Sequence, residues 1–121
     1  MAIAAIKSRD EEQQAAVDRA HLARMSFGDA ALERELLGLF ERQAALLLGR
    51  MREADAATLA ALAHTLKGSA SGIGVWGVAQ AAAAVEQATS PAERNLALDD
   101  LAAAIAHAQA EIGAMLASPA E

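Results

Sequence analysis

Residues 64–69, with the sequence HTLKGS, hold the side chains in this chain that are best suited to handling phosphate. On a helix, positions three and four apart share a face, so Lys67 and Gly68 both lie beside His64. Imidazole is a nucleophile that titrates near neutrality, and the lysine ammonium is a compact positive charge. The glycine leaves bare backbone that another molecule can approach closely. This combination predicts a site that carries a phosphoryl group.

The helix predicted to hold this run keeps His64 away from its buried side. Asp55 can cap the start of this helix, and its end is expected at Gly72-Ile73-Gly74, with Gly72 in the left-handed conformation. The apolar residues share one face: Leu59, Leu62, Ala63, Leu66 and Ala70. The neighbours of His64 on its own face are small: Ala60, Ala61, Gly68 and Ser71. His64 is therefore expected to face solvent, within reach of the active site of another protein.

Four further helices are predicted from apolar periodicity and capping signals. They cover about Asp10 to Met25, Asp29 to Met51, Val75 to Ala88, and Ser90 to just before Pro119. The second has its apolar residues at helical spacing: Leu32, Leu36, Phe40, Ala44, Leu47, Leu48 and Met51. The last opens with a capping box made by Ser90, Pro91 and Glu93. These amphipathic helices predict an all-α fold, an antiparallel four-helix bundle with an additional N-terminal helix packed across it.

Length and composition limit what such a chain can do. Its 121 residues suffice for one domain, predicted to span 13–118, with 1–12 as an N-terminal extension or the start of the first helix. The net charge of −6 and the lack of a basic stripe argue against nucleic-acid binding. No run approaches the roughly 20 apolar residues of a membrane span, and the apolar start at Ala2–Ile6 is too short for a signal peptide. With no cysteine either, a soluble, cytoplasmic protein is expected.

Several segments together resemble the histidine-containing phosphotransfer (HPt) family. The run 63–70, AHTLKGSA, resembles the central motif of the family, and 36–40, LLGLF, resembles its aromatic-bearing second helix. Gly74 matches the glycine that closes the turn, and Val85-Glu86 matches an apolar–acidic pair on the following helix. The similarity extends over about Val17 to Leu116. It implies a phosphocarrier of a multistep two-component phosphorelay, which passes a phosphoryl group between the aspartates of receiver domains.

The resemblance also implies roles for individual residues. His64 would accept the phosphoryl group through Nε2, and Lys67 would stabilise its charge. Gly68 would allow close approach of the partner, while Ser69 matches the motif without a clear role. Glu86 would accept a hydrogen bond from Nδ1–H of His64, which fixes the tautomer that leaves Nε2 free. No cofactor is implied for the chain itself, since the receiver domains of hybrid histidine kinases and response regulators would supply Mg²⁺ and the aspartate.

A docking surface is expected around His64. Its candidate residues are Val17, Leu22, Ala60, Ala61, Ser71 and Trp76. Trp76, the single tryptophan, could instead pack at the edge of the core, and Val17 and Leu22 belong to the surface only if the first helix flanks His64 and leaves them exposed. A monomer is expected, because His64 must stay accessible and the helices can bury their apolar faces internally.

Three other classes of protein remain possible interpretations of the sequence. A helical adaptor could keep the fold and lack the chemistry. The dimerisation segment of a sensor kinase also phosphorylates a histidine, but it usually has an acidic residue where Thr65 stands and a proline near Ser69. A metal-binding bundle would need paired Glu-x-x-His helices. Asp18 and His21 have a spacing that could bind metal, but no second such pair is present, so no metal site is expected.

Overall fold

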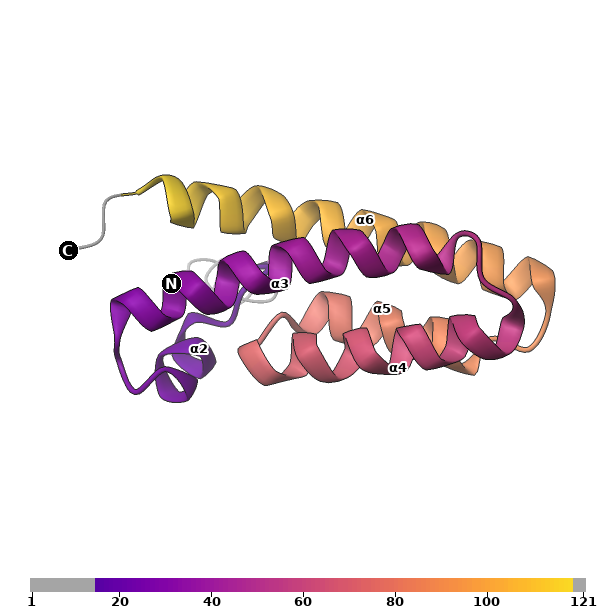
Figure 1. The fold of residues 1–121 in the computed structure, drawn as a ribbon, viewed down its shortest axis with the longest axis horizontal. Coiled ribbons are helices and arrows are strands. Elements are labelled where there is room, and N and C mark those ends of the chain that lie inside the picture. Colours follow the sequence, from indigo (N-terminus) through magenta and orange to yellow (C-terminus); the bar gives the residue numbers. More distant parts are fainter. Residues whose placement is uncertain (1–14, 119–121) are drawn as a thin grey trace, which may run out of the picture.

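The computed structural model describes residues 15–118, and the predicted extension 1–12 lies outside this range. Five α-helices follow one another: α2 (Arg19–Met25), α3 (Ala30–Met51), α4 (Ala56–Ile73), α5 (Trp76–Gln87) and α6 (Pro91–Ala117). Residues 15–118 contain no strand. Figure 1 shows that α3, α4, α5 and α6 alternate in direction, and α3 also packs against α6 to close the bundle. The predicted all-α bundle is confirmed.

The helix starts follow the capping signals in the sequence. Asp29 accepts a hydrogen bond from the backbone N–H of Leu32, and Asp55 accepts one from Thr58. At the start of α6, the Ser90 hydroxyl oxygen accepts from the backbone N–H of Glu93 at 3.1 Å. The Glu93 carboxylate in turn accepts from the backbone of Thr89, one residue before the cap, at 2.9 Å. These local bonds satisfy N–H groups that a helix leaves unpaired at its start, which fixes where three of the bundle helices begin.

One hydrophobic core runs through the bundle. On α4 the predicted apolar face is confirmed, with Leu62 only partly buried and Ile73 added at its end. On α3 the buried face is turned slightly from the predicted one. Its fully buried members are Leu37, Phe40, Ala44, Leu47 and Met51. Leu32 and Leu36 are only half-buried, so the buried face of α3 is centred on Phe40 and Ala44.

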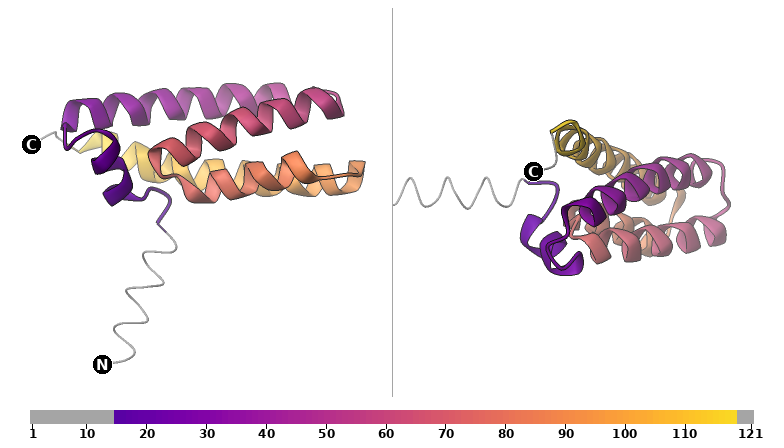
Figure 2. Two further views of the ribbon diagram at one scale, coloured as in Figure 1. Left: turned by 90° about the horizontal axis from the view of Figure 1, so that it is seen from below. Right: turned by 60° about the vertical axis from the view of Figure 1, so that its left-hand side comes forward.

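The hairpin of α4 and α5 is shorter than the helices beside it, and the N-terminal segment fills the difference. At 1.5 Å per residue, α3 is about 33 Å and α6 about 40 Å long, whereas α4 is about 27 Å and α5 about 18 Å. Figure 2 shows α2 beside the end of this hairpin at which the turn joins α4 to α5. Ala16, Val17 and Leu22 are buried there. This segment therefore completes the core beyond the turn between α4 and α5.

The N-terminal helix is shorter than predicted. It begins at Arg19, because residues 15–18 are not helical and the backbone N–H groups just before the helix have tertiary partners. Those of Ala16 and Val17 donate to the two carboxylate oxygens of Glu111 on α6, at 3.0 and 2.9 Å. The N–H of Asp18 donates to the carbonyl of Gly74 at 2.9 Å, and its carboxylate caps α2. The acidic run 10–12 lies outside the described residues.

The end of α4 also differs from the prediction. The helix continues through Ile73, which reaches the core, and Gly74 rather than Gly72 adopts the left-handed conformation, with φ of 85°. A Cβ atom on Gly74 would lie 3.1 Å from the Cβ and the carbonyl oxygen of Asp18 and from the Cβ of His21. Both the turn and the contact with the N-terminal segment therefore require glycine at this position.

Among residues 15–118, no helix is long and apolar enough to span a membrane.

Candidate functional site

His64, Lys67 and Glu86 form one hydrogen-bonded group on the surface of the α4–α5 pair. His64 and Lys67 come from adjacent turns of α4, and Glu86 comes from the last turn of α5. Nδ1 of His64 lies 2.8 Å from Oε2 of Glu86, and Nζ of Lys67 lies 2.8 Å from Oε1 of the same carboxylate. The antiparallel packing of α4 and α5 thus brings together residues 22 positions apart in the sequence.

The burial of these three side chains is unequal. The side chain of His64 is 67% exposed, whereas those of Lys67 and Glu86 are 34% and 27% exposed. The carboxylate and the ammonium therefore lie deeper in the surface than the imidazole that they support. His64 is the group that an approaching protein meets first.

Glu86 is a charged acceptor at neutral pH. The hydrogen bond from Lys67, and next the one from His64, lower the pKa of Glu86 below the ordinary glutamate value, against a smaller opposing effect of burial. An ionised carboxylate can only accept hydrogen bonds, so the contact with His64 requires the proton on Nδ1. In the neutral imidazole, Nε2 then carries the lone pair and points away from the bond that orients the ring.

The lowered pKa predicts how this group responds to acid. Because the folded protein favours the ionised carboxylate, the contribution of these contacts to stability is present above the ordinary pKa of glutamate and is lost as the pH falls through the lowered pKa. A carboxyl NMR titration should therefore find Glu86 still ionised below pH 4.5, and in Lys67→Ala the midpoint of Glu86 should rise. An unchanged midpoint in Lys67→Ala would show that Lys67 does not hold this carboxylate in solution.

The surroundings of His64 are small and open. A Cβ atom on Gly68 would meet no atom within 4 Å, so free space lies directly over the helix one turn beyond His64. Ala61 is exposed, while Ala60 and Ser71 are half-exposed on the same side of α4. No long side chain of α4 therefore covers the approach to the imidazole. Among residues 15–118 the Ser69 hydroxyl has no hydrogen-bond partner, whereas the Thr65 hydroxyl donates to the carbonyl of Ala61.

Two of the candidate docking residues are in the core instead. Val17 is 2% exposed and Leu22 is 1% exposed, because they cover the apolar end of the α4–α5 hairpin. The expectation that their side chains are available to a partner is wrong. The sequence pattern of this segment was too loose to show which of its apolar residues point inward.

Trp76 lies at the opposite end of α5 from Glu86. It is 41% exposed at the first position of α5, about 15 Å along the helix axis from Glu86. Its indole Nε1–H donates to the carboxylate of Asp18 at 2.9 Å, and its ring meets that of His21 edge-on at 5.0 Å between centroids. The indole hydrogen bond is the largest cause of a lowered pKa of Asp18. Trp76 thus joins the N-terminal segment to α5 and still exposes part of its ring.

Both carboxylate oxygens of Asp18 and the ring Nε2 of His21 have partners within the protein. Asp18 caps α2 and binds Trp76, and the ring Nε2 of His21 lies 3.1 Å from the carbonyl oxygen of Gly72. The part of the chain that the structure describes contains no group of three or more acidic or histidine side chains arranged to hold a metal ion.

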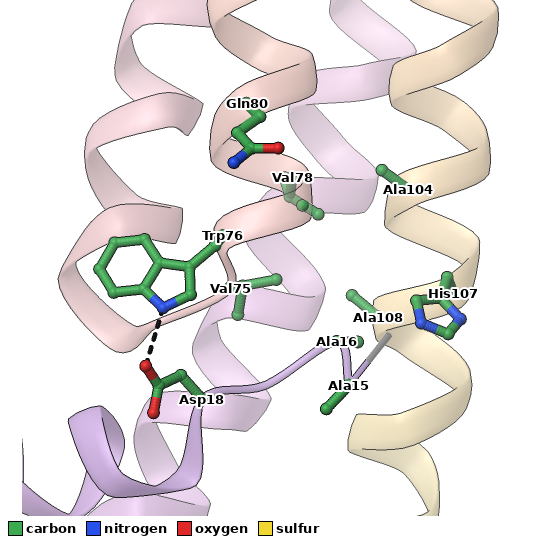
Figure 3. Close-up of a pocket in the computed structure, with 11 residues that line it drawn as sticks. Ala15, Ala16, Asp18, Val75, Trp76, Val78, Gln80, Ala104, His107 and Ala108 are labelled. Atoms are coloured by element: carbon green, nitrogen blue, oxygen red, sulfur yellow. Dashed lines mark hydrogen bonds between the residues drawn. The ribbon is translucent and has the colours of Figure 1, made fainter. Parts of the chain in front are cut away.

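A pocket of about 250 Å³ lies apart from His64. Figure 3 shows it between the N-terminal segment, the start of α5 and α6, with Trp76 and Val78 on one side and Ala104 and Ala108 on the other. Neither His64 nor Lys67 lines it. The histidine site is therefore an open surface, which suits a reaction with another protein better than the enclosure of a small molecule.

The contact between Lys67 and Glu86 is the one feature of the site that the sequence patterns do not predict. The resemblance placed Glu86 beside His64, and helical spacing placed Lys67 beside His64. Together these two relations bring Lys67 near Glu86, and this is the signal that could have revealed the contact. The Glu86 carboxylate therefore binds His64 through one oxygen and Lys67 through the other.

Comparison with known families identifies the chain. The family model described as Hpt domain matches residues 32–118, which is more than two thirds of the sequence. The match covers α3 from its third residue, all of α4, α5 and α6, and the whole histidine site. No curated protein and no solved structure gave a match. The bundle, the exposed histidine and the family match agree, and the chain belongs to the Hpt domain family.

Proposed function

We propose that this protein carries a phosphoryl group on Nε2 of His64 between the aspartates of receiver domains in a multistep phosphorelay. Membership of the Hpt family gives it a histidine phosphotransfer role, as a phosphocarrier rather than a classical enzyme, with receiver domains as partners. The observation that carries the assignment to His64 is its geometry. The ring is exposed, its Nδ1 is bound to Glu86, and its Nε2 is left for the reaction.

The transfer step follows from this arrangement. The lone pair of Nε2 attacks the phosphorus of an aspartyl phosphate, a phosphorus–nitrogen bond forms, and the phosphorus–oxygen bond breaks with its electron pair remaining on the aspartate. The imidazole gains positive charge as the new bond forms, and the Glu86 carboxylate, 2.8 Å from Nδ1, stabilises that charge. Transfer to the next receiver is the reverse reaction with a different aspartate.

Lys67 provides the positive charge on the protein's own side of the reaction. It lies one turn from His64 and is held by Glu86, so its ammonium is already positioned next to the reacting ring. Phosphoryl transfer depends chiefly on positioning and on charge stabilisation. We propose that Lys67 stabilises the phosphoryl oxygens and that the receiver domain supplies its own Mg²⁺ and aspartate.

The small residues around His64 suit docking of a receiver domain. Gly68 leaves open space for the loops that surround the donor aspartate, and Ala60, Ala61 and Ser71 present little bulk beside it. We propose Trp76 as an aromatic contact at the edge of this surface, since half-exposed tryptophan is frequent among energetically important interface residues.

A transfer assay tests the proposed function. The protein is mixed with a receiver domain that has been phosphorylated on its aspartate in the presence of Mg²⁺, and label on each protein is followed with time. The expected result is label on this protein that acid removes and base does not, as for phosphohistidine, with loss of label from the receiver. A protein that only scaffolds helices would remain unlabelled with every receiver of its organism, which would overturn the proposal.

Lys67→Ala is expected to slow this transfer without unfolding the bundle. Loss of one positioned charge from a phosphoryl-transfer site reduces the rate by roughly tenfold to a hundredfold, in line with 1.4 kcal/mol per factor of ten. The side chain is one-third exposed and bonds to Glu86 alone among the described residues, so the thermal unfolding midpoint should change little. Arg94→Ala, on α6, is the matched control. A wild-type transfer rate in Lys67→Ala would remove this lysine from the mechanism.

A further inference from the structure

The outward side of α3 carries an apolar patch that nothing in the described chain covers. Leu39 and Leu46 are each 56% exposed, and they lie two helical turns apart on one side of the helix. Exposed charges and a glycine surround them. Together these residues form what we call the α3 outer face: Glu35, Leu39, Arg42, Leu46, Gly49 and Arg50. Their positions are about 10 Å apart along the helix axis, so a second helix laid along this side of α3 would meet both leucines.

The charges of this face have no ion-pair partner among the residues that the structure describes. Among residues 15–118 the ion pairs are those of Glu86 with His64 and with Lys67, and none involves Glu35, Arg42 or Arg50. The acidic member of the face lies toward the start of α3, and Arg50 lies in its last turn. A partner that runs in the opposite direction would therefore meet an opposite charge at each end of the face.

We propose that the α3 outer face binds the same face of a second copy of this protein, with the two α3 helices antiparallel. A two-fold axis between positions 42 and 43 places Leu39 opposite Leu46 of the second copy, and Glu35 opposite its Arg50. The symmetry repeats both pairs, so one arrangement buries four leucine side chains and forms two ion pairs. This self-complementarity is what a two-fold interface requires, and it is the reason to infer a second copy rather than an unrelated partner.

The charges select this arrangement over its alternatives. In a parallel pair, each of Glu35, Arg42 and Arg50 would face its own like charge. In an antiparallel pair centred on Leu46, Arg42 would face Arg50. Centred on Leu39, the pair would set Glu35 opposite Gln43 and leave Arg50 without an acidic partner. Only the axis between positions 42 and 43 both pairs the leucines with each other and places Glu35 opposite Arg50.

The side chains nearest that axis leave room for it. The guanidinium of Arg42 lies back over Gly38, with Nη1 3.4 Å from where a Cβ would be. In antiparallel helices two such side chains point in opposite directions along the axis, so the two arginines diverge. A Cβ on Gly49 would meet no atom within 4 Å. Glycine is less favourable than alanine inside a helix, and a close approach of the second helix is a use for it.

Such a dimer leaves the histidine site open. α3 packs against α4 and α6, whereas His64 and Glu86 lie on the surface of the α4–α5 pair. Both copies could therefore still meet receiver domains. Four leucines and two ion pairs make a small interface, so the dimer is expected to be weak and to depend on concentration. The expectation of a monomer then holds at low concentration only.

Sedimentation velocity from micromolar to millimolar protein tests this inference. The wild-type mass should rise toward that of a dimer, whereas Leu39→Gln/Leu46→Gln should stay monomeric. Leu96→Gln, which removes a leucine that is 68% exposed on α6, is the matched control and should behave as wild type. A wild-type protein that stays monomeric throughout, or a leucine double variant that still dimerises, would overturn the proposal. Circular dichroism establishes that each variant is folded.

Charge reversal tests the register itself. Glu35→Arg alone or Arg50→Glu alone should weaken the dimer by about tenfold, because two attractive contacts become repulsive. The double variant Glu35→Arg/Arg50→Glu restores opposite charges and should return to the wild-type dissociation constant. If the double variant is as weak as the single ones, the antiparallel pairing is wrong. The inference does not rest on the phosphotransfer role, and transfer to His64 should be unaffected in all of these variants.

Discussion

His64→Gln should abolish phosphoryl acceptance and leave the bundle folded. Glutamine has no nucleophilic ring nitrogen, so no phosphorus–nitrogen bond can form at this position. The side chain of His64 is 67% exposed and contacts Glu86 at the surface, so the free energy of unfolding should change by no more than about 0.5 kcal/mol. The transfer assay measures the first effect, and chemical denaturation measures the second.

His107→Gln is the matched control for this loss. His107 is also exposed and helical, but it lies on α6 and lines the pocket away from His64. Its replacement should leave labelling at the wild-type level. Retention of label by a folded His64→Gln protein would place the acceptor elsewhere and contradict the assignment.

Gly74→Ala should destabilise the protein by about 2–4 kcal/mol, the largest stability effect expected of any methyl-sized change. Part of this is the left-handed backbone, since φ of 85° is unfavourable for alanine by about 1–2 kcal/mol. The rest is overlap, because the new Cβ would lie 3.1 Å from the backbone oxygen of Asp18, which cannot move without loosening the N-terminal segment. Thermal and urea unfolding measure the change.

Gly113→Ala is the control for the same chemical change. Gly113 lies inside α6, and a Cβ there would meet no atom within 4 Å. Alanine should stabilise the helix by about 0.5–1 kcal/mol. The two substitutions should therefore shift stability in opposite directions. Equal stability of Gly74→Ala and wild type would show that the α4–α5 turn and the N-terminal segment are not packed as described.

The fold was predictable where local chemistry determines it. Asp29, Asp55 and Ser90 cap the next helices through bonds to residues three positions on, and such bonds depend on nearby sequence alone. The start of α2 was not predictable in this way. It depends on Glu111, more than ninety positions distant, and on the carbonyl of Gly74. Helical propensity before Arg19 was overruled by these tertiary hydrogen bonds.

For the site, too, relations within one helix could be predicted from the sequence, whereas relations between helices could not. Helical spacing alone predicts that Lys67 and Gly68 share the face of His64, because the relation lies within one helix. The position of Glu86 depends on the register between α4 and α5, which periodicity does not give, and it came from the family resemblance. The prediction that Gly72 takes the left-handed conformation was wrong, because the sequence offers two glycines in this turn and local signals do not choose between them. The contact with Asp18 and His21 explains why Gly74 is the one.

The most direct test of the central claim is to locate the phosphoryl group by ¹⁵N and ³¹P NMR. Protein labelled with ¹⁵N is phosphorylated by a phosphorylated receiver domain, and the ring nitrogens of all three histidines are assigned. We expect the phosphoryl group on Nε2 of His64, with the proton retained on Nδ1 beside Glu86. A phosphoryl group on Nδ1 of His64, on His21 or on His107 would contradict the account.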